Sequence, residues 1–450
     1  MSAPAPSIIW FRRDLRLADH AALTAAAADG PLLPLFVLDD DTPGQFAIGG
    51  AQRWWLHHSL AALADRLGGK LLLRRGPAAK VVRELARETG AVSVHATRLY
   101  EPWERATEQA LTDLVTLHDG ETLVALDQLT TRAGTPFKVY GAFWSALAEH
   151  LPPPAPLPES ELTFSDTRAG GRLADWHLLP THPNWAARFG DHAVPGEIGA
   201  LDQLDAFSEH APLYHQRRDL PSDDATSRLS PHLHFGEISP RQVWHALAPR
   251  GGTKYLKELA WRDFARSALL AQPDLALRDG RAGMAKLEWR CGAQADADFA
   301  AWTAGRTGFP IVDAGMRQLW TTGWMHNRVR MIAASFLVKH LLIDWRRGAA
   351  WFWDTLVDAD LGNNALNWQW IAGTGTASQG FERVMAPLLQ SVKFDAADYV
   401  RRWIPELADL DDAHIHEPAD LVRGDYPPLL IGHREGRARA LDALAKARAS

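Results

Sequence analysis

Residues 8–38 read IIWFRRDLRLADHAALTAAAADGPLLPLFVL, and this stretch decides the fold class of the N-terminal part. It begins with a short apolar run and continues with an alanine-rich segment that Asp19 can cap. It ends with a second apolar run at Leu32–Leu38. A strand, a helix and a second strand in this order form a βαβ unit with parallel strands. The same alternation continues downstream, so we predict an α/β domain with a doubly wound, Rossmann-like parallel sheet.

Further elements complete this alternation up to about residue 130. Helices are expected at Trp54–Leu67, Val81–Glu88 (closed by Gly90) and Glu104–Leu117. Strands are expected at Lys70–Arg74, Ser93–Ala96 and Thr122–Leu126. No GxGxxG pattern follows the first strand, which argues against a dinucleotide site of the usual kind there.

The composition limits the classes of protein. A chain of 450 residues is too long for one ordinary domain, and 46% hydrophobic residues can fill sizeable cores. Its single cysteine, Cys291, excludes an internal disulfide and a multi-cysteine metal site, and we expect no metal. The net charge of −6 does not by itself indicate a nucleic-acid binder, since binding depends on local patches. No secretory signal and no apolar run of roughly 20 residues is visible, so we expect a cytoplasmic protein without membrane contact.

The pattern changes after a proline-rich connector at Pro152–Pro158. Strand signals vanish, and helices are expected at Lys254–Leu270, Ile311–Trp320, Asn327–Leu342, Ala349–Val357 and Glu435–Arg448. Ser239 to Gln242 forms a capping box to which we assign no function. We therefore predict an antenna-type α/β domain over residues 1–130, a linker over 131–200 and an all-α domain over 201–450.

Two segments carry polar groups at helical spacing. Thr226 to Ser230 places hydroxyls and a guanidinium at a helix start, where they can cradle a pyrophosphate or simply cap the helix. Glu258, Trp261 and Arg262 share one helical face. On this face the indole could stack on a base and the carboxylate could accept hydrogen bonds from the base edge. A surface Glu–Arg ion pair beside a tryptophan of the core would give the same pattern.

Two further segments add possible walls of a site. Asn327, Arg330 and Met331 share a helical face, whereas Arg328 is turned about 100° away and can reach a phosphate. We assign a structural role to His326. In Asp358 to Trp370, Trp368 and Trp370 lie about 200° apart on a helix, so one can face a substrate while the other faces the protein interior.

Six segments, in the same order along the chain, resemble the photolyase–cryptochrome family. They are Trp10–Arg16, Thr226–Ser230, Glu258–Arg262, Thr307–Asp313, Gly323–Met331 and Asp358–Trp370. The resemblance extends from Ile8 to the final helix. Residues 49–58 are similar to the bacterial photolyase subclass nearest to plant cryptochromes.

The resemblance implies an FAD site in the helical domain. The residues that would hold FAD are Tyr214, Thr226, Ser227, Arg228, Leu229, Ser230, Arg262, Arg330, Asp358, Asp360 and Asn364. Asn364 matches the residue that faces the flavin N5, where asparagine is the photolyase-like choice and plant cryptochromes carry aspartate. Trp368, Trp345 and Trp289 match the chain that carries electrons to the excited flavin.

The resemblance also implies a lesion cavity and a DNA-binding surface. Glu258, Trp261, Asn327, Met331 and Trp370 would line the cavity, with Asn364 counted among the catalytic residues. Arg218, Arg328, Arg383 and Gln390 would contact DNA. The expected activity is light-driven splitting of cyclobutane pyrimidine dimers in ultraviolet-damaged DNA by an FAD-dependent carbon–carbon lyase that acts as a monomer. A second chromophore such as methenyltetrahydrofolate is expected only through the match at Glu104.

The chain departs from the family pattern at Thr376–Pro387, where only Arg383 and Pro387 are retained, and at Phe264–Ser267. An acidic residue at Glu382 would oppose binding to DNA phosphates. These departures keep open a cryptochrome-like blue-light photoreceptor with weak or no repair activity. A light-independent flavoprotein oxidoreductase is the third alternative, and it would need a nicotinamide site that the sequence does not show.

Overall fold

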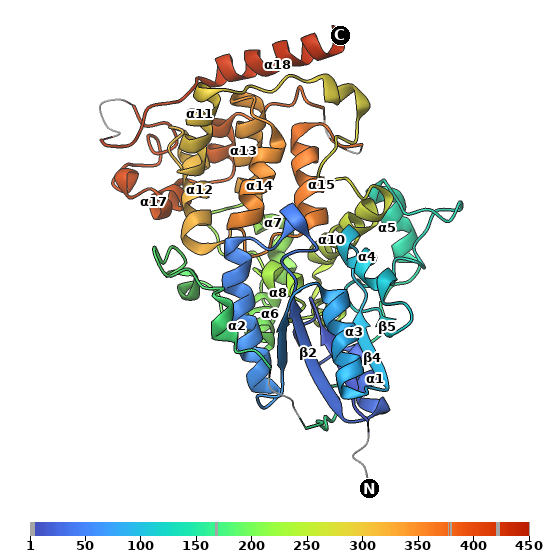
Figure 1. Ribbon diagram of the computed structural model, residues 1–450. Helices are drawn as coiled ribbons and strands as arrows, with labels where there is room; N and C mark the ends of the chain where they lie inside the picture. Colours follow the sequence, from blue (N-terminus) through green and yellow to red (C-terminus); the bar gives the residue numbers. More distant parts are fainter. Residues whose placement is uncertain (1–4, 167–169, 377, 379, 420–423, 450) are drawn as a thin grey trace. The chain divides into compact units, whose positions relative to one another are not determined.

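The structure is a computed structural model that describes residues 5–166, 170–376, 378, 380–419 and 424–449 (Figure 1). The chain forms two compact units. The first unit contains residues 1–212 and 227–273, and the second contains residues 213–226 and 274–450. Within the described ranges, no helix has the length and apolar character needed to cross a membrane.

A parallel five-stranded sheet lies at the centre of the first unit (Figure 1). Its strands are β1 (Ser7–Phe11), β2 (Leu32–Leu38), β3 (Leu72–Arg75), β4 (Ser93–Thr97) and β5 (Val115–His118). They lie in the order β3-β2-β1-β4-β5, and in the register of β1 Trp10 lies opposite Leu35 on one side and Ala96 on the other. This arrangement confirms the predicted doubly wound parallel sheet.

Four helices accompany the strands: α1 (Ala21–Asp29), α2 (Gly50–Arg66), α3 (Ala78–Thr89) and α4 (Pro102–Ala110). Alternate side chains of β1 point to opposite faces of the sheet. Trp10 packs in one apolar cluster with Val82 and Leu85 of α3. Phe11, on the other face, meets His20 at the start of α1 with ring centroids 5.3 Å apart. Helices α1 and α3 therefore cover opposite faces of the sheet.

Two predictions in the first unit are wrong. The helix expected at Glu104–Leu117 ends at Ala110, and the fifth strand is Val115–His118 rather than Thr122–Leu126. The segment after Thr122 forms bends because its polar groups have other partners. The hydroxyl of Thr122 donates to the carbonyl of Val124 at 2.9 Å, and the N–H of Leu123 donates to Asp263 at 2.8 Å.

The prediction that Asp19 caps α1 is also wrong. The cap is His20, whose ring accepts a hydrogen bond from the N–H of Leu23 at 3.2 Å. The carboxylate of Asp19 is engaged by the guanidinium of Arg241 at 2.5 Å and by the N–H of Leu157 at 2.9 Å. It joins two distant segments of the first unit instead of closing a helix end.

The first unit also contains helices from the later sequence. They are α5 (Tyr140–Ala148), α6 (Glu197–Ser208), α8 (Ser230–His234), α9 (Pro240–Leu247) and α10 (Thr253–Ala271). The capping box of α9 is present as predicted. Phe143 of α5 packs on Phe264 of α10 with ring centroids 5.7 Å apart. Such contacts tie these helices to the first unit. The division between the two units therefore differs from the predicted boundaries at residues 130 and 200.

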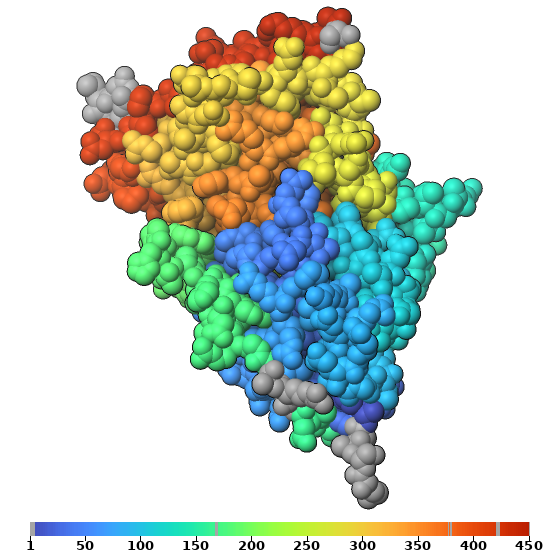
Figure 2. Space-filling view, viewed as in Figure 1, coloured from blue at the N-terminus to red at the C-terminus, as the bar shows by residue number. Residues whose placement is uncertain are grey.

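The described residues of the second unit form helices joined by loops, without a strand. Its helices are α7 (Tyr214–Arg217), α11 (Ala293–Thr303), α12 (Pro310–Thr322), α13 (Asn327–Ser335), α14 (Trp345–Thr355), α15 (Leu361–Ala372), α16 (Pro387–Lys393), α17 (Ala397–Trp403) and α18 (His433–Ala449). The helix predicted at 327–342 ends at Ser335 and continues as a π-helical turn over Phe336–His340. Trp302, Trp345 and Tyr399 are fully buried in the core, and α18 lies on the surface (Figure 2).

Candidate active site

The N-terminus of α15 gathers the polar residues expected around a flavin in the second unit. Asp360 caps the helix, and its carboxylate accepts hydrogen bonds from the backbone N–H of Asn363 at 2.8 Å and from its amide at 2.7 Å. Arg330 of α13 forms a two-bond ion pair with Asp358, at 3.1 and 2.9 Å. Paired hydrogen bonds of this kind fix the guanidinium in one orientation. The structure thus brings the predicted Arg330, Asp358 and Asp360 into one hydrogen-bonded region.

Asn364 follows one turn into α15. Its amide donates to the carbonyl of Ala349 on α14 at 3.0 Å, which fixes the orientation of the side chain. The side chain is half-buried, so it is neither packed away nor fully in solvent. This placement suits a residue that presents one polar group to a cofactor ring.

Trp368 lies in the core one turn after Asn364, at 3% exposure. Gly348 of α14 lies against its ring so closely that an added Cβ would meet Cη2 of Trp368 at 2.2 Å. Only glycine permits this approach of α14 to α15. Trp370, two residues on, is partly buried at the edge of the same core. Trp368 is therefore more deeply buried than Trp370, as expected if only one of the two tryptophans faces the protein interior.

Trp345 and Trp289 are the other predicted electron carriers. Trp345 is fully buried, and its indole N–H donates to the carboxylate of Asp279 at 2.8 Å. The guanidinium of Arg346 lies over the Trp345 ring at 4.6 Å from its centroid. Trp289 is partly buried and packs near Phe381, with ring centroids 6.4 Å apart. All three predicted carriers, Trp289, Trp345 and Trp368, lie in the second unit.

Sequence reasoning missed two rings that contact Trp368. Phe352 of α14 lies 5.0 Å from it and Trp302 of α11 lies 6.4 Å from it, centroid to centroid. Trp302 is fully buried, and its indole N–H donates to the carbonyl of Ala333 at 3.1 Å. The available signal was the spacing of Ala295, Phe299 and Trp302, which places all three on one apolar face of a helix.

Gln369 is a third residue that the sequence did not mark. It is fully buried between the two tryptophans of α15, and its amide nitrogen donates to the carbonyls of Leu275 at 2.6 Å and Arg278 at 2.9 Å. Its amide oxygen accepts from the N–H of Gly280 at 2.9 Å. These three side-chain hydrogen bonds anchor the segment that carries Asp279, the partner of Trp345.

Two of the predicted DNA-contacting arginines share one anion. Arg328 pairs with Asp219 at 2.8 Å, and Arg218 lies 3.7 Å from the same carboxylate group. The guanidinium of Arg328 also lies 4.5 Å from the centroid of Phe394, at the C-terminal end of α16. His326 caps α13 by accepting from the N–H of Arg328 at 3.2 Å, which agrees with the structural role expected for it.

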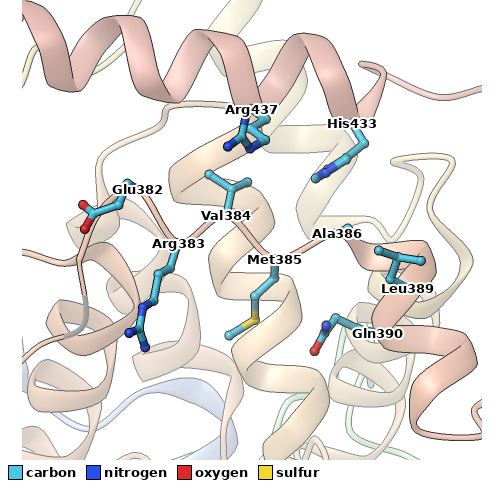
Figure 3. Close-up of a pocket in the computed structure, with 9 residues that line it drawn as sticks. All are labelled: Glu382, Arg383, Val384, Met385, Ala386, Leu389, Gln390, His433 and Arg437. Atoms are coloured by element: carbon cyan, nitrogen blue, oxygen red, sulfur yellow. The ribbon is translucent and has the colours of Figure 1, made fainter.

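The other two predicted DNA contacts, Arg383 and Gln390, line a shallow surface pocket of about 520 Å³ (Figure 3). The remaining lining residues are Glu382, Val384, Met385, Ala386, Leu389, His433 and Arg437. His433 and Arg437 belong to α18, and Figure 3 shows Arg383 extending away from that helix. Glu382 lies 3.7 Å from Arg448, so its charge is partly offset by α18.

The divergent segment at Thr376–Pro387 packs into the second unit, although its residues 377 and 379 lie outside the described residues. Phe381 is buried, and its carbonyl accepts from the ammonium of Lys339 at 2.8 Å. Lys339 also donates to the carbonyl of Ala372 at the end of α15, at 3.3 Å. Burial lowers the pKa of Lys339 to about 7. The segment is thus tied to α15 from inside the unit, while Arg383 stays exposed.

The remaining cavity candidates of the second unit lie on α13. Asn327 is its exposed first residue, and Met331 is partly buried against the core one turn later. The guanidinium of Arg328 lies 3.6 Å from the sulfur of Met331. Tyr214 of α7 is buried, with the guanidinium of Arg218 5.2 Å from its ring centroid.

Helix α10 carries the candidates of the first unit. Glu258 forms an ion pair with Lys254 at 3.0 Å and keeps about a quarter of its side chain exposed, at 28%. Trp261 is 39% exposed, so it is not the core tryptophan of the alternative interpretation. Arg262 donates to the carbonyls of Glu121 at 2.5 Å and Leu233 at 3.0 Å. The structure therefore assigns Arg262 contacts to backbone carbonyls of its own unit.

The predicted pyrophosphate segment spans the division between the units, with Thr226 in the second and Ser227–Ser230 in the first. The hydroxyl of Ser227 donates to Tyr255 at 2.9 Å and accepts from the N–H of Leu229 at 3.2 Å. Arg228 has a φ of 50°, a left-handed conformation that is rare outside glycine. Ser230 begins α8, so the expected helix start is present.

The antenna candidate Glu104 is engaged by Arg12, which also pairs with Glu108. Arg12 follows β1, at the point where the strand order reverses between β1 and β4. Sheets of this kind place ligands outside the carboxyl ends of the strands at such a point. Arg12 and Glu108 are buried there, so an ion-paired cluster lies at the carboxyl end of β1.

The chemistry of these groups fits the flavin part of FAD. A flavin ring edge offers both carbonyl acceptors and an N–H donor, so it needs fixed donors and acceptors together. Around the N-terminus of α15 lie the guanidinium of Arg330 from α13, the carboxylates of Asp358 and Asp360, and the amide of Asn364, all four oriented by hydrogen bonds. Trp368 on the same helix supplies a redox-active ring within the core.

Comparisons with known proteins agree with this chemistry. Residues 7–161 match the DNA photolyase family model, and residues 255–446 match the model described as the FAD-binding domain of DNA photolyase. The deoxyribodipyrimidine photo-lyase of Agrobacterium fabrum is 45% identical, covering 98% of this chain and 98% of that protein. Cryptochrome-1 of Arabidopsis thaliana is 35% identical, covering 98% of this chain and 70% of that protein. The chain therefore belongs to the photolyase–cryptochrome family.

Solved structures of photolyases are similar to this chain. The crystal structure of a bacterial class III photolyase from Agrobacterium tumefaciens has a TM-score of 0.93 at 44% identity and covers 100% of this chain and 99% of that one. An archaeal photolyase from Sulfolobus tokodaii, solved with two FAD molecules, has a TM-score of 0.83 at 28% identity, covering 98% and 99%. These findings confirm the predicted family, the two-part fold with an FAD-binding domain, and the similarity to bacterial photolyases.

Proposed function

We propose that this chain uses light to split cyclobutane pyrimidine dimers in ultraviolet-damaged DNA. The observation that carries the proposal is on α10, where the indole of Trp261 is 39% exposed and the carboxylate of Glu258 lies one turn before it. An exposed indole offers a flat ring on which an extruded base can stack. Similarity to photolyases over nearly the whole chain supports repair as the purpose of that stacking.

The residues of the proposed site have separate tasks. Trp261 and Trp370 stack on the extruded dimer, which is already poorly stacked in the duplex and therefore costs less to flip out. Asn327 and Met331 form part of the cavity wall. Glu258 accepts hydrogen bonds from the base edge and stabilises charge that develops on the dimer, which is an electrostatic role.

The DNA backbone is held by Arg218, Arg328, Arg383 and Gln390 in this proposal. Each arginine that neutralises a phosphate releases counterions, so affinity falls as salt rises. Asp219 competes with phosphate for Arg328, because the ion pair of 2.8 Å has to loosen before the guanidinium can turn to DNA. The protein acts as a monomer, and no metal takes part.

FAD, when bound, supplies the electron that opens the cyclobutane ring under light and takes that electron back. The proposed holding residues are Tyr214, Thr226, Ser227, Arg228, Leu229, Ser230, Arg262, Arg330, Asp358, Asp360 and Asn364. Asn364 presents its oriented amide to the ring. Trp368, Trp345 and Trp289 bring electrons from the surface to restore the reduced cofactor. A folate antenna at Glu104 would have to displace Arg12 from the carboxylate.

Binding in the dark tests the lesion site. We expect the FAD-loaded protein to bind a duplex with one thymine dimer more tightly than the matched undamaged duplex. Trp261→Ala and Trp370→Ala should each weaken binding to the damaged duplex by roughly 1–3 kcal/mol, the value of lost base stacking. Equal affinity for both duplexes, together with unaltered binding by the two variants, would contradict the proposal.

A cryptochrome-like photoreceptor is the second candidate. The 35% identity to Arabidopsis cryptochrome-1 and the divergent segment at Thr376–Pro387 favour it. Asparagine at position 364 favours repair, since the family resemblance places aspartate there in plant cryptochromes. A photoreceptor would change its flavin absorption under blue light without preferring damaged DNA. A light-independent oxidoreductase would instead accept electrons from NADPH in darkness.

A further inference from the structure

Tyr140, the first residue of α5, lies face to face with Trp261 of α10 in the first unit. The two ring centroids are 3.7 Å apart and the ring planes differ by 5°. At this separation the facing surfaces of the two rings are in van der Waals contact. Phe264 meets Trp261 edge-on, with centroids 5.6 Å apart and an interplanar angle of 83°. One face of the indole is therefore covered, and its exposed part lies away from Tyr140.

Tyr140 is itself fixed by the α5–α10 packing. Its hydroxyl donates to the carbonyl of Lys257 at 3.0 Å, one turn before Trp261. The Tyr140 ring also meets Phe264 edge-on, with centroids 5.7 Å apart. Phe143, one turn further along α5, packs on the same Phe264. The contacts of Tyr140 with Lys257 and Phe264 would both be broken if its ring turned away from the indole.

We infer that Tyr140 is a positioning residue for lesion recognition, whose ring supports the Trp261 indole so that the opposite face meets an extruded base. This inference rests on the proposed function, in which Trp261 stacks on the lesion. Ordering a free side chain on binding reduces affinity by roughly 2- to 12-fold. The stack orders the indole before DNA arrives, so this loss is avoided.

The chain offers a matched control on the same helix. Trp144 of α5 also packs against α10, but its ring lies against the ammonium of Lys257 at 5.4 Å rather than against Trp261. Trp144→Ala removes a larger ring from the α5–α10 contact and leaves the stack in place. Any effect of general loosening between the two helices should therefore appear in this variant as well.

Dark binding of the FAD-loaded protein to thymine-dimer and undamaged duplexes tests the inference. Tyr140→Leu should weaken binding to the damaged duplex by roughly 2- to 12-fold and leave binding to the undamaged duplex unchanged. Tyr140→Phe, which keeps the stacked ring, should bind within about twofold of the unaltered protein, as should Trp144→Ala. If Tyr140→Leu does not retain FAD, Tyr140→Met provides the same test.

A double-mutant cycle with Trp261→Ala separates positioning from a purely structural role. If Tyr140 acts through the indole, Tyr140→Leu should cause no further loss in the Trp261→Ala background. An equal loss in both backgrounds would overturn the inference, as would full affinity of Tyr140→Leu while Trp261→Ala is weakened. If the unaltered protein does not prefer damaged DNA and Trp261→Ala has no effect, the proposed function fails first and the inference with it.

Discussion

Replacing Gly348 by alanine should destabilise the second unit. An added Cβ would lie 2.2 Å from Cη2 of Trp368 and 2.6 Å from Cδ2 of Leu337. Carbon atoms attract one another best at about 3.5–4.0 Å, so both contacts overlap strongly. Overpacking of this kind costs roughly 1–3 kcal/mol, and the two overlaps place the cost near the upper end. Alanine in a helix recovers about 0.5–1 kcal/mol relative to glycine. The expected net loss is about 2 kcal/mol.

Urea unfolding of the FAD-loaded protein, followed by circular dichroism, measures this loss. Gly283→Ala is the matched control, because a Cβ at Gly283 would meet nothing within 4 Å. We expect the control to unfold with the unaltered protein and Gly348→Ala to unfold at lower urea concentration. We also expect Gly348→Ala to slow photoreduction of the flavin, since the Trp368 ring has to move. A Gly348→Ala protein as stable as the control would refute the packing of α14 against Trp368.

Three further predictions follow from the same core. Burial lowers the pKa of His340 to about 3 and that of His326 to about 4. In the unfolded chain both histidines titrate near 6.5, so the unfolded state takes up protons first as the pH falls. The free energy of unfolding therefore decreases from pH 6.5 downward. Each of the two histidines should lower the free energy of unfolding by roughly 2 kcal/mol at pH 5. Equal urea midpoints at pH 7.5 and pH 5 would contradict this. Trp368→Phe should slow photoreduction at least about tenfold yet leave repair by chemically reduced protein intact, and normal photoreduction would mean that Trp368 is not the carrier. Gln369→Leu should lower the free energy of unfolding by about 2–4 kcal/mol, because the buried carbonyl of Leu275 and the part-buried backbone groups of Arg278 and Gly280 lose their partner. An unchanged urea midpoint would show that water replaces the amide.

Local patterns predicted much of the fold. Apolar runs gave β1 and β2 almost to the residue, and the pair Ser239 and Gln242 gave a capping box. These features depend on neighbours in sequence. The strand at Val115–His118 was missed because its four residues follow a helical segment with only a short turn between them. Asp19 was misjudged because its partner Arg241 lies more than two hundred residues away.

For the candidate site too, features within one helix were predicted, whereas contacts between helices were not. Spacing along one helix predicted that Glu258 and Trp261 share a face and that one of Trp368 and Trp370 faces the interior; the structure buries Trp368. Contacts between helices could not be read from spacing. The ring of Tyr140 on Trp261 depends on how α5 meets α10, and a tyrosine beside valine and glycine in sequence gives no sign of it.

Repair itself tests the central claim most directly. The FAD-loaded protein, with its flavin chemically reduced, is mixed with an oligonucleotide that holds one thymine dimer and is kept in blue light or in darkness. We predict that intact thymines are restored in light alone, and that an oligonucleotide with a (6-4) photoproduct stays unaltered. Dimers that persist under illumination, in protein that binds the damaged strand and carries reduced FAD, would contradict the assignment of a light-driven lyase.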